Sequence, residues 1–313
     1  MDDETISPAY TGLSRLKLFF ALSRTPHGLL DMTTPAFAAL LWLGSYPSLT
    51  VIILGIITTF SGYTAVYALN DVVDYRVDRE KIRHGGFQDS ENYLDGVMVR
   101  HPMAQGILSF REGLIWASAW GFLALAGAYI LNPVCALIFL IAAALEAIYC
   151  LLWRVSHYRT LVSGAVKTSG AMAAVFAVDP NPSPLFLLIL FLCLFFWEIG
   201  GQNIPADWTD IEEDRQLNAR TIPVRFGLER ANLIILVSII LALILNMILF
   251  LVSQVRFELP FILAALCLGL YLLLAPALKL FKTRARPDAM ALFNKASHYP
   301  AVLLVVVAIK LML

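Results

Sequence analysis

The 313-residue chain has little charge and few residues that build disulfides or zinc sites. Only 15% of its residues are charged, Lys and Arg equal Asp and Glu at 23 each, and 59% are apolar. This composition excludes an ordinary soluble domain, and we expect no nucleic-acid partner. The four cysteines fall within apolar runs and show no CxxC spacing. Neither a disulfide framework nor a zinc site is therefore indicated.

Long apolar runs fill most of the sequence instead. About 20 apolar residues suffice to cross the hydrocarbon core of a membrane, and we count about nine such runs. They lie near residues 27–46, 50–69, 113–131, 134–153, 161–178, 184–202, 231–253, 258–278 and 294–312. The sequence therefore predicts an all-α integral membrane protein, a bundle of about nine transmembrane helices with cytoplasmic cap loops.

Lysine and arginine concentrate in alternate gaps between these runs. The N-terminal segment and the second, fourth, sixth and eighth gaps hold nearly all of them, whereas the other gaps contribute only Arg256. Positive charge marks the cytoplasmic side of a membrane protein. We therefore expect the N-terminus and the basic loops on the cytoplasmic side, and the C-terminus outside.

Two acidic clusters follow apolar runs, and both lie in cytoplasmic gaps. The first, in NDVVDYRVD, comprises Asn70, Asp71, Asp74 and Asp78, and the second, in NIPADWTDIEED, comprises Asp207, Asp210 and Asp214. On a helix, each set falls on one stripe, roughly 100° wide for the first and about 60° wide for the second. Pro205, just ahead of the second set, predicts a new helical segment or a kink.

The surroundings of the clusters also repeat loosely. Each cluster leads to a segment with an arginine, a proline and a glycine, RHPMAQG from Arg100 and RTIPVRFG from Arg220. Such a correspondence indicates two related halves. We predict one transmembrane domain over 1–313, with halves at about 20–155 and 160–280 and a ninth helix at 294–312.

The crowding of these acids predicts a metal site. Carboxylates on one face repel one another, and a multivalent cation removes that repulsion. With oxygen ligands and no His or Cys nearby, the clusters favour Mg²⁺, which a few carboxylates commonly share with phosphate oxygens. The clusters therefore indicate a metal-bridged phosphate or diphosphate, and a diphosphate at the membrane surface suggests a lipid tail.

The two acidic motifs resemble a known pair of signatures. NDxxDxxxD after the second run and DxxDxxxD after the sixth are similar to those of the UbiA superfamily of intramembrane prenyltransferases. DIEEDRQLNARTIPVRFG is similar to the family's continuation of the second signature, and the nine-span layout agrees over nearly the whole chain. The resemblance implies Mg²⁺-dependent transfer of an isoprenyl group from a prenyl diphosphate donor to a small hydrophobic or aromatic acceptor within the lipid bilayer.

Charge and resemblance together assign roles to side chains. We expect the metal ligands to be Asn70, Asp71, Asp74, Asp78, Asp207, Asp210 and Asp214, of which Asp71, Asp74, Asp207 and Asp210 are catalytic. The cations expected at the diphosphate are Arg24, Lys167, Arg76 and Arg220. The residues expected around the acceptor or the prenyl group are Tyr149, Glu146, Glu198 and Asn203.

Several of these roles have alternatives. Acids within a span need a partner, so we expect Glu146 or Glu198 to contact the acceptor or to pair with Lys167, the alternative being a helix-packing hydrogen bond. Lys167 could instead reach the membrane interface, and Arg76 could be a surface base. The long stretch at 84–99 suggests a lid over the site.

The sequence leaves the acceptor open. By analogy with the family we expect an aromatic quinone precursor, and the alternative is a non-aromatic lipid acceptor such as a glycerol phosphate. A metal-ion transporter is the alternative of a different class, because intramembrane acids also mark ion pathways. Transporter sites tend to lie near the midplane of the membrane, however, whereas these clusters lie at one face.

Overall fold

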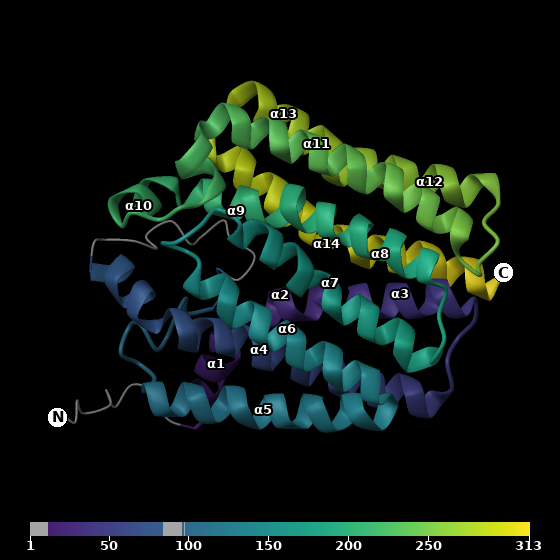
Figure 1. Cartoon of the computed structure of the whole chain (residues 1–313), viewed down its shortest axis with the longest axis horizontal. Coiled ribbons are helices and arrows are strands. Elements are labelled where there is room, and N and C mark those ends of the chain that lie inside the picture. The colour runs from purple at the N-terminus through teal and green to yellow at the C-terminus, as the bar shows by residue number, and fades with distance from the viewer. Residues whose placement is uncertain (1–11, 84–95, 97) are drawn as a thin grey trace.

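Figure 1 shows the computed structural model, in which long helices lie side by side in a bundle. The structure describes residues 12–83, 96 and 98–313. All regular elements in these ranges are helices. The lid expected at 84–99 lies almost entirely outside the described residues.

Eight helical segments among the described residues are long and apolar enough to cross a membrane. Six are single helices: α4 (Leu49–Arg83), α5 (Phe110–Leu131), α6 (Pro133–Leu151), α7 (Arg159–Val178), α11 (Ile222–Val252) and α14 (Arg286–Met312). The seventh joins α8 (Pro184–Trp197), the π-helix η1 (Glu198–Asn203) and α9 (Ile204–Thr209), and the eighth joins α12 (Leu259–Gly269), η2 (Leu270–Leu274) and α13 (Ala275–Thr283). The predicted all-α, multi-pass membrane fold is confirmed.

The first predicted span differs from the prediction. Three shorter helices precede α4, namely α1 (Leu13–Leu22), α2 (Thr25–Asp31) and α3 (Thr33–Leu43), and the run at 27–46 is divided between the last two. Pro35 lacks the N–H that would bond to the carbonyl of Asp31, which is why the helix is interrupted there. Counted by length, the described chain therefore has eight spans rather than nine.

The first acidic cluster lies on an unbroken helix. α4 continues for 35 residues, past the end of the apolar run and through the cluster. Lys81 and Arg83 fall in its last turn, where positive side chains favour the helix end. The predicted helical stripe is therefore confirmed for the first cluster, and α5 packs along the same helix.

The helix that carries the second acidic cluster is interrupted, so the prediction of a single helical stripe is wrong there. α9 ends at Thr209, Asp210 stands at the junction, and α10 (Ile211–Gln216) carries Asp214. Pro205 begins this change, as predicted: it cannot donate to the carbonyl of Gly201, and the turn just before it widens into η1.

Close packing holds η1 in place. A Cβ on Gly200 would lie 2.9 Å from the carbonyl oxygen of Ile235, and one on Gly201 would lie 2.8 Å from the Cβ of Ala296. Only glycine fits at these two positions, because α11 and α14 press on the turn from two sides. The main apolar core continues from this contact, with Trp197 and Trp208 fully buried in it.

Candidate active site

A cavity of about 700 Å³ connects the two acidic clusters with the apolar interior of the bundle. At one end it is lined by acids from both clusters, at the end of the bundle where α10 lies (Figure 1). The rest of its wall is largely small and apolar, for example Gly55, Ala128, Ala177 and Ala308. The cavity therefore combines a charged head with a long apolar arm.

The first cluster faces this cavity from α4. Asn70, Asp74 and Asp78 line the wall, whereas Asp71 is buried (3% exposed) and does not. Arg24, at the start of α2, donates from Nη2 to Oδ1 of Asn70 and to Oδ1 of Asp71, each at 3.1 Å. The structure thus places Arg24 at the first cluster, while its contact with a diphosphate stays a prediction.

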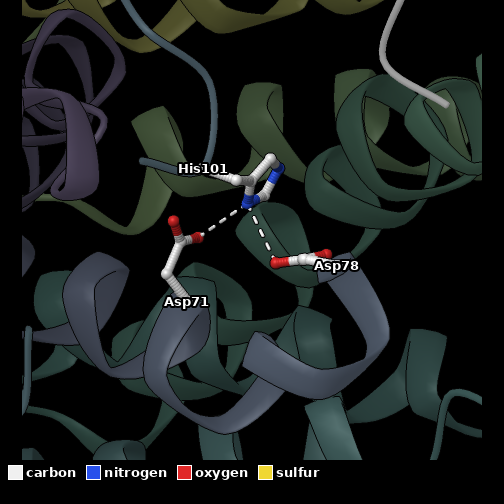
Figure 2. Close-up of side chains that lie close together, drawn as sticks. All are labelled: Asp71, Asp78 and His101. Atoms are coloured by element: carbon white, nitrogen blue, oxygen red, sulfur yellow. Dashed lines mark ion pairs between the residues drawn. The ribbon is translucent and has the colours of Figure 1, made fainter. Parts of the chain in front are cut away.

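His101 completes the first cluster, and sequence reasoning missed it. Its Nδ1 lies 3.2 Å from Oδ1 of Asp71 and 2.9 Å from Oδ2 of Asp78, between the two carboxylates (Figure 2). The expectation that no histidine lies near the acids is wrong, because His101 reaches them from the segment between α4 and α5. Burial alone would lower the pKa of His101, but the carboxylates of Asp78 and Asp71 outweigh burial and raise the pKa to about 9.

The second cluster is tied to cations from elsewhere in the chain. Asp210 lies 3.7 Å from Nη2 of Arg100, and Asp214 lies 3.5 Å from Nζ of Lys81. Lys81 belongs to α4, so this ion pair links the helices that carry the two clusters. Asp214 also accepts a hydrogen bond from Oγ1 of Thr221 at 3.1 Å, yet burial raises the pKa of its carboxyl.

Arg159 is a second residue that the sequence analysis missed. At the start of α7 and only 5% exposed, it donates from Nη1 to Oδ1 of Asp207 at 3.1 Å. Its guanidinium lies 4.1 Å from the ring centre of Tyr149, a cation–π distance. In sequence it is one more base at the end of an apolar run, and nothing local distinguishes it from a surface residue.

The residues around the acids fit a divalent cation. The two clusters contain six carboxylates, and four of these, Asp71, Asp207, Asp210 and Asp214, form ion pairs with the permanently charged side chains of Arg24, Arg159, Arg100 and Lys81. The charge is therefore not balanced by the permanent cations in this part of the chain. Oδ2 of Asp207 is buried and has no hydrogen-bond partner within residues 12–83, 96 and 98–313, an arrangement that a cation would relieve. Carboxylate oxygens are the ligands that Mg²⁺ prefers.

Lys167 lies in the cavity, but its partner differs from the prediction. Nζ is 2.7 Å from Oδ2 of Asp31 and 3.2 Å from the hydroxyl of Tyr67, which itself bonds to Asp31. The expected pairing of Lys167 with Glu146 or Glu198 is therefore wrong. The alternative that Lys167 reaches the interface also fails, because the side chain lines the cavity and is 14% exposed.

The four residues expected at the acceptor or the prenyl group all line the cavity. Glu146 accepts a hydrogen bond from Nδ2 of Asn70 at 2.7 Å, and Asn203 donates to the hydroxyl of Tyr149 at 3.1 Å. Glu198 accepts from Oγ of Ser163 at 2.7 Å. Its other oxygen, Oε2, is buried and has no hydrogen-bond partner in the part of the chain that the structure describes, and the same holds for Oδ1 of Asn203.

Two of the cations expected at the diphosphate do not reach the cavity. Arg76 is exposed on α4 and is not part of the lining, which agrees with its alternative as a surface base. Arg220 is also exposed and donates to the carbonyl of Val155 at 3.2 Å. The helical turn that orients Asp74 and Asp78 inward turns Arg76 outward.

The chain as a whole is similar in sequence to known proteins. The sequence model of the UbiA prenyltransferase family matches residues 32–299. A 4-hydroxybenzoate octaprenyltransferase of Pseudomonas fluorescens strain SBW25 is 24% identical over 207 residues, which are 64% of this chain and 63% of that protein. The same enzyme of strain Pf-5 is 26% identical over 221 residues, 67% of this chain and 66% of that protein. The chain thus spans just under two thirds of these relatives.

Solved structures share the fold. A UbiA homolog from Aeropyrum pernix K1, in its apo form, superposes with a TM-score of 0.74 at 19% identity, covering 92% of this chain and 98% of that one. A UbiA homolog from Archaeoglobus fulgidus bound to DMAPP and Mg²⁺ gives a TM-score of 0.68 at 19% identity, covering 94% and 99%. At this level of identity the likeness establishes the helical architecture.

Proposed function

The chain belongs to the UbiA prenyltransferase family, and on that premise we propose that it transfers a prenyl group from a prenyl diphosphate to a small aromatic acceptor. The allylic carbon–oxygen bond breaks, diphosphate leaves, and the allylic carbon bonds to the acceptor, which loses a proton. The observation that carries this proposal is one cavity with two acidic clusters at its head and an apolar arm behind them.

The head of the cavity suits a diphosphate held by Mg²⁺. The oxygens that would hold the metal come from Asn70, Asp71, Asp74, Asp78, Asp207, Asp210 and Asp214. When bound, Mg²⁺ supplies positive charge against the negative charge that develops on the leaving diphosphate. Arg24 and Arg159 lie at opposite clusters and can donate charge-assisted hydrogen bonds to diphosphate oxygens between them.

The arm of the cavity suits the prenyl chain. An apolar wall disfavours water, which would otherwise capture an allylic cation. The Phe, Tyr and Trp residues that line the cavity are Tyr46, Tyr63, Tyr67, Phe139, Tyr149, Trp153 and Phe293. Arg159 already covers the ring of Tyr149 and Lys81 lies 4.7 Å from the ring of Trp153, so these two rings are engaged by cations. Arg24 and Lys167 likewise lie 5.8 Å and 5.9 Å from the ring of Tyr67. Tyr63, which lines the same part of the cavity, is therefore the ring we assign to the allylic cation.

The acceptor that fits best carries a phenolic hydroxyl. Oε2 of Glu198 and Oδ1 of Asn203 are buried hydrogen-bond acceptors on the cavity wall, and no donor for them occurs among the described residues. An unpaired buried acceptor is costly, and a hydroxyl of the substrate would satisfy it. The curated relatives act on 4-hydroxybenzoate, as their names state, and this supports a phenolic quinone precursor.

We place the acidic clusters on the cytoplasmic side. The loops at that end contain most of the basic residues, as the positive-inside rule requires. The C-terminus lies at the opposite end of the bundle from α10 (Figure 1). In this proposed orientation the C-terminus is outside.

One experiment tests the proposed function. The purified protein, reconstituted in liposomes, is given a labelled prenyl diphosphate and one acceptor at a time: 4-hydroxybenzoate, a phenol without a carboxylate, or glycerol phosphate. We expect a prenylated phenol and an equal amount of diphosphate with Mg²⁺, and neither product with EDTA. Divalent-ion flux across the liposomes without diphosphate release would contradict the proposal and favour a transporter. Product with glycerol phosphate alone would contradict the aromatic acceptor.

A further inference from the structure

The two acidic clusters differ in their donor atoms. Asp207, Asp210 and Asp214 offer only oxygen, and the cations near them are arginine and lysine, which are not metal ligands. The first cluster contains a histidine as well. One ligand atom from each of Asp71, Asp78 and His101 lies within 4.8 Å of the other two, and all three residues are buried.

The distances within this group match those between ligands of one ion. A divalent ion sits about 2.1 Å from nitrogen or oxygen, so two ligands at a right angle lie about 3.0 Å apart. Nδ1 of His101 is 2.9 Å from Oδ2 of Asp78 and 3.2 Å from Oδ1 of Asp71 (Figure 2). The three atoms could thus surround an ion with small movements, and Arg24 would share the Asp71 oxygen that it already contacts.

The backbone holds His101 in place for this contact. Its φ of 50° lies in the left-handed region, which few residues other than glycine adopt. Met103 and Leu108 anchor the segment in a small apolar core, and the carbonyl of His101 accepts a hydrogen bond from Gln105. Uncommon backbone geometry that aims a side chain at a cluster of ligands indicates a function for that side chain.

We infer that His101 is a metal ligand, and that Asp71, Asp78 and His101 form a mixed nitrogen–oxygen site that binds Mn²⁺ more tightly than Mg²⁺. Imidazole favours transition ions, whereas Mg²⁺ prefers oxygen. The protein then has two unlike ion sites, this one and an oxygen-only site at the second cluster. The inference deepens the proposed function and rests on it, because both ions would act on the same diphosphate.

Pulsed EPR of bound Mn²⁺ tests this directly, because a ligated imidazole nitrogen modulates the electron spin echo. We expect a nitrogen coupling in the wild-type protein that is absent in His101→Asn. Asparagine is the variant of choice, since it tolerates the left-handed backbone. The matched control is His298→Gln, an exposed histidine on α14 outside the cavity, and it should keep the coupling.

The affinity for Mn²⁺ should fall at least about tenfold in His101→Asn, since even supporting partners of a metal ligand are worth that much. The affinity for Mg²⁺ should fall less. Labelling the wild-type protein with ¹⁵N-histidine should replace the coupling by that of ¹⁵N, so the result does not depend on the folding of the variant.

Three outcomes would overturn the inference: no Mn²⁺ bound, Mn²⁺ bound without a nitrogen coupling, or a coupling that persists in His101→Asn. The second is expected if His101 is only a protonated bridge between the two carboxylates. Failure of the proposed function would appear elsewhere, as the absence of Mg²⁺-dependent diphosphate release from the wild-type protein.

Discussion

The two acidic clusters have similar motifs, yet the chain carries them on different scaffolds. On α4, an unbroken helix spaces Asn70, Asp74 and Asp78 one turn apart along one face. At the second cluster, a π-turn, a short helix and a junction residue set the positions of Asp207, Asp210 and Asp214. A rigid helix fixes its acids by itself, whereas the broken segment depends on what packs around it.

The clusters also differ in what completes them. His101 closes the first cluster, while Arg159, Lys81 and Arg100 pair with the acids of the second. The sequence motif therefore specifies the ligands, and tertiary packing specifies which charged side chains surround them. The same substitution made in each cluster should therefore lower the catalytic rate by a similar factor, but change the stability of the protein by different amounts.

The largest effect is expected from removing one acid of each cluster. Asp74→Asn and Asp207→Asn should each lower the rate of diphosphate release by about a thousandfold, because each removes charge that holds the metal. Only Asp207→Asn should also lower the melting temperature, because it weakens the partner of the buried Arg159.

The matched control for these two variants is Glu229→Gln, an exposed acid outside the cavity, which should behave as wild type. Equal thermal shifts in Asp74→Asn and Asp207→Asn would contradict the difference between the clusters.

Substitution of the cations at the two clusters should have the second largest effect. Arg159→Gln should weaken donor binding about a hundredfold and Arg24→Gln about tenfold, because a buried charge-assisted bond is worth more than a partly exposed one. The Arg24 side chain is 27% exposed and that of Arg159 is 6% exposed. Binding of a labelled prenyl diphosphate, measured in reconstituted protein, gives the two ratios, and a larger loss at Arg24 would reverse this ranking.

Packing around η1 should have a smaller effect. In Gly201→Ala the new methyl group must displace Ala296, which costs about 1–3 kcal/mol of stability and shifts the second cluster, so we expect turnover to fall severalfold. Gly121→Ala on α5 is the control, since its Cβ would meet Ala65 at an ordinary 3.8 Å. Thermal unfolding and turnover are measured for both variants. Identical values for the two variants would contradict the claim that packing around η1 positions the second cluster.

The smallest effect is expected at the exposed arginines. Arg76→Ala and Arg220→Ala should change donor affinity less than about twofold, because charges outside the cavity are screened by water and salt. A tenfold loss of donor affinity in either variant would contradict this prediction and indicate that the side chain contacts the diphosphate.

Much of this arrangement could be predicted from local sequence. The apolar runs indicated the membrane fold, and the spacing of acids on α4 indicated one helical face. Pro205 indicated the interruption of the helix before the second cluster. The break at Asp210 could not be foreseen, because neither a proline nor a glycine occurs there.

The missed residues share one property, which is that distant segments bring them to the site. His101 lies 23 positions after Asp78, and the pair of Lys167 with Asp31 spans 136 positions. No periodicity or motif encodes such a contact, since it arises only when helices pack together. His101 still carried a weak signal, as the RHPMAQG segment repeats the pattern that follows the second cluster.

The central claim is that both clusters act on one diphosphate through bound metal. Affinity for a hydrolysis-resistant prenyl diphosphate analogue, measured with Mg²⁺ and with EDTA, tests it most directly. We predict that Mg²⁺ tightens binding to the wild-type protein, and that Asp74→Asn and Asp207→Asn each remove this gain, with the double variant losing no more than either single one. If either single variant keeps the full gain, the clusters do not share a ligand and the account is contradicted.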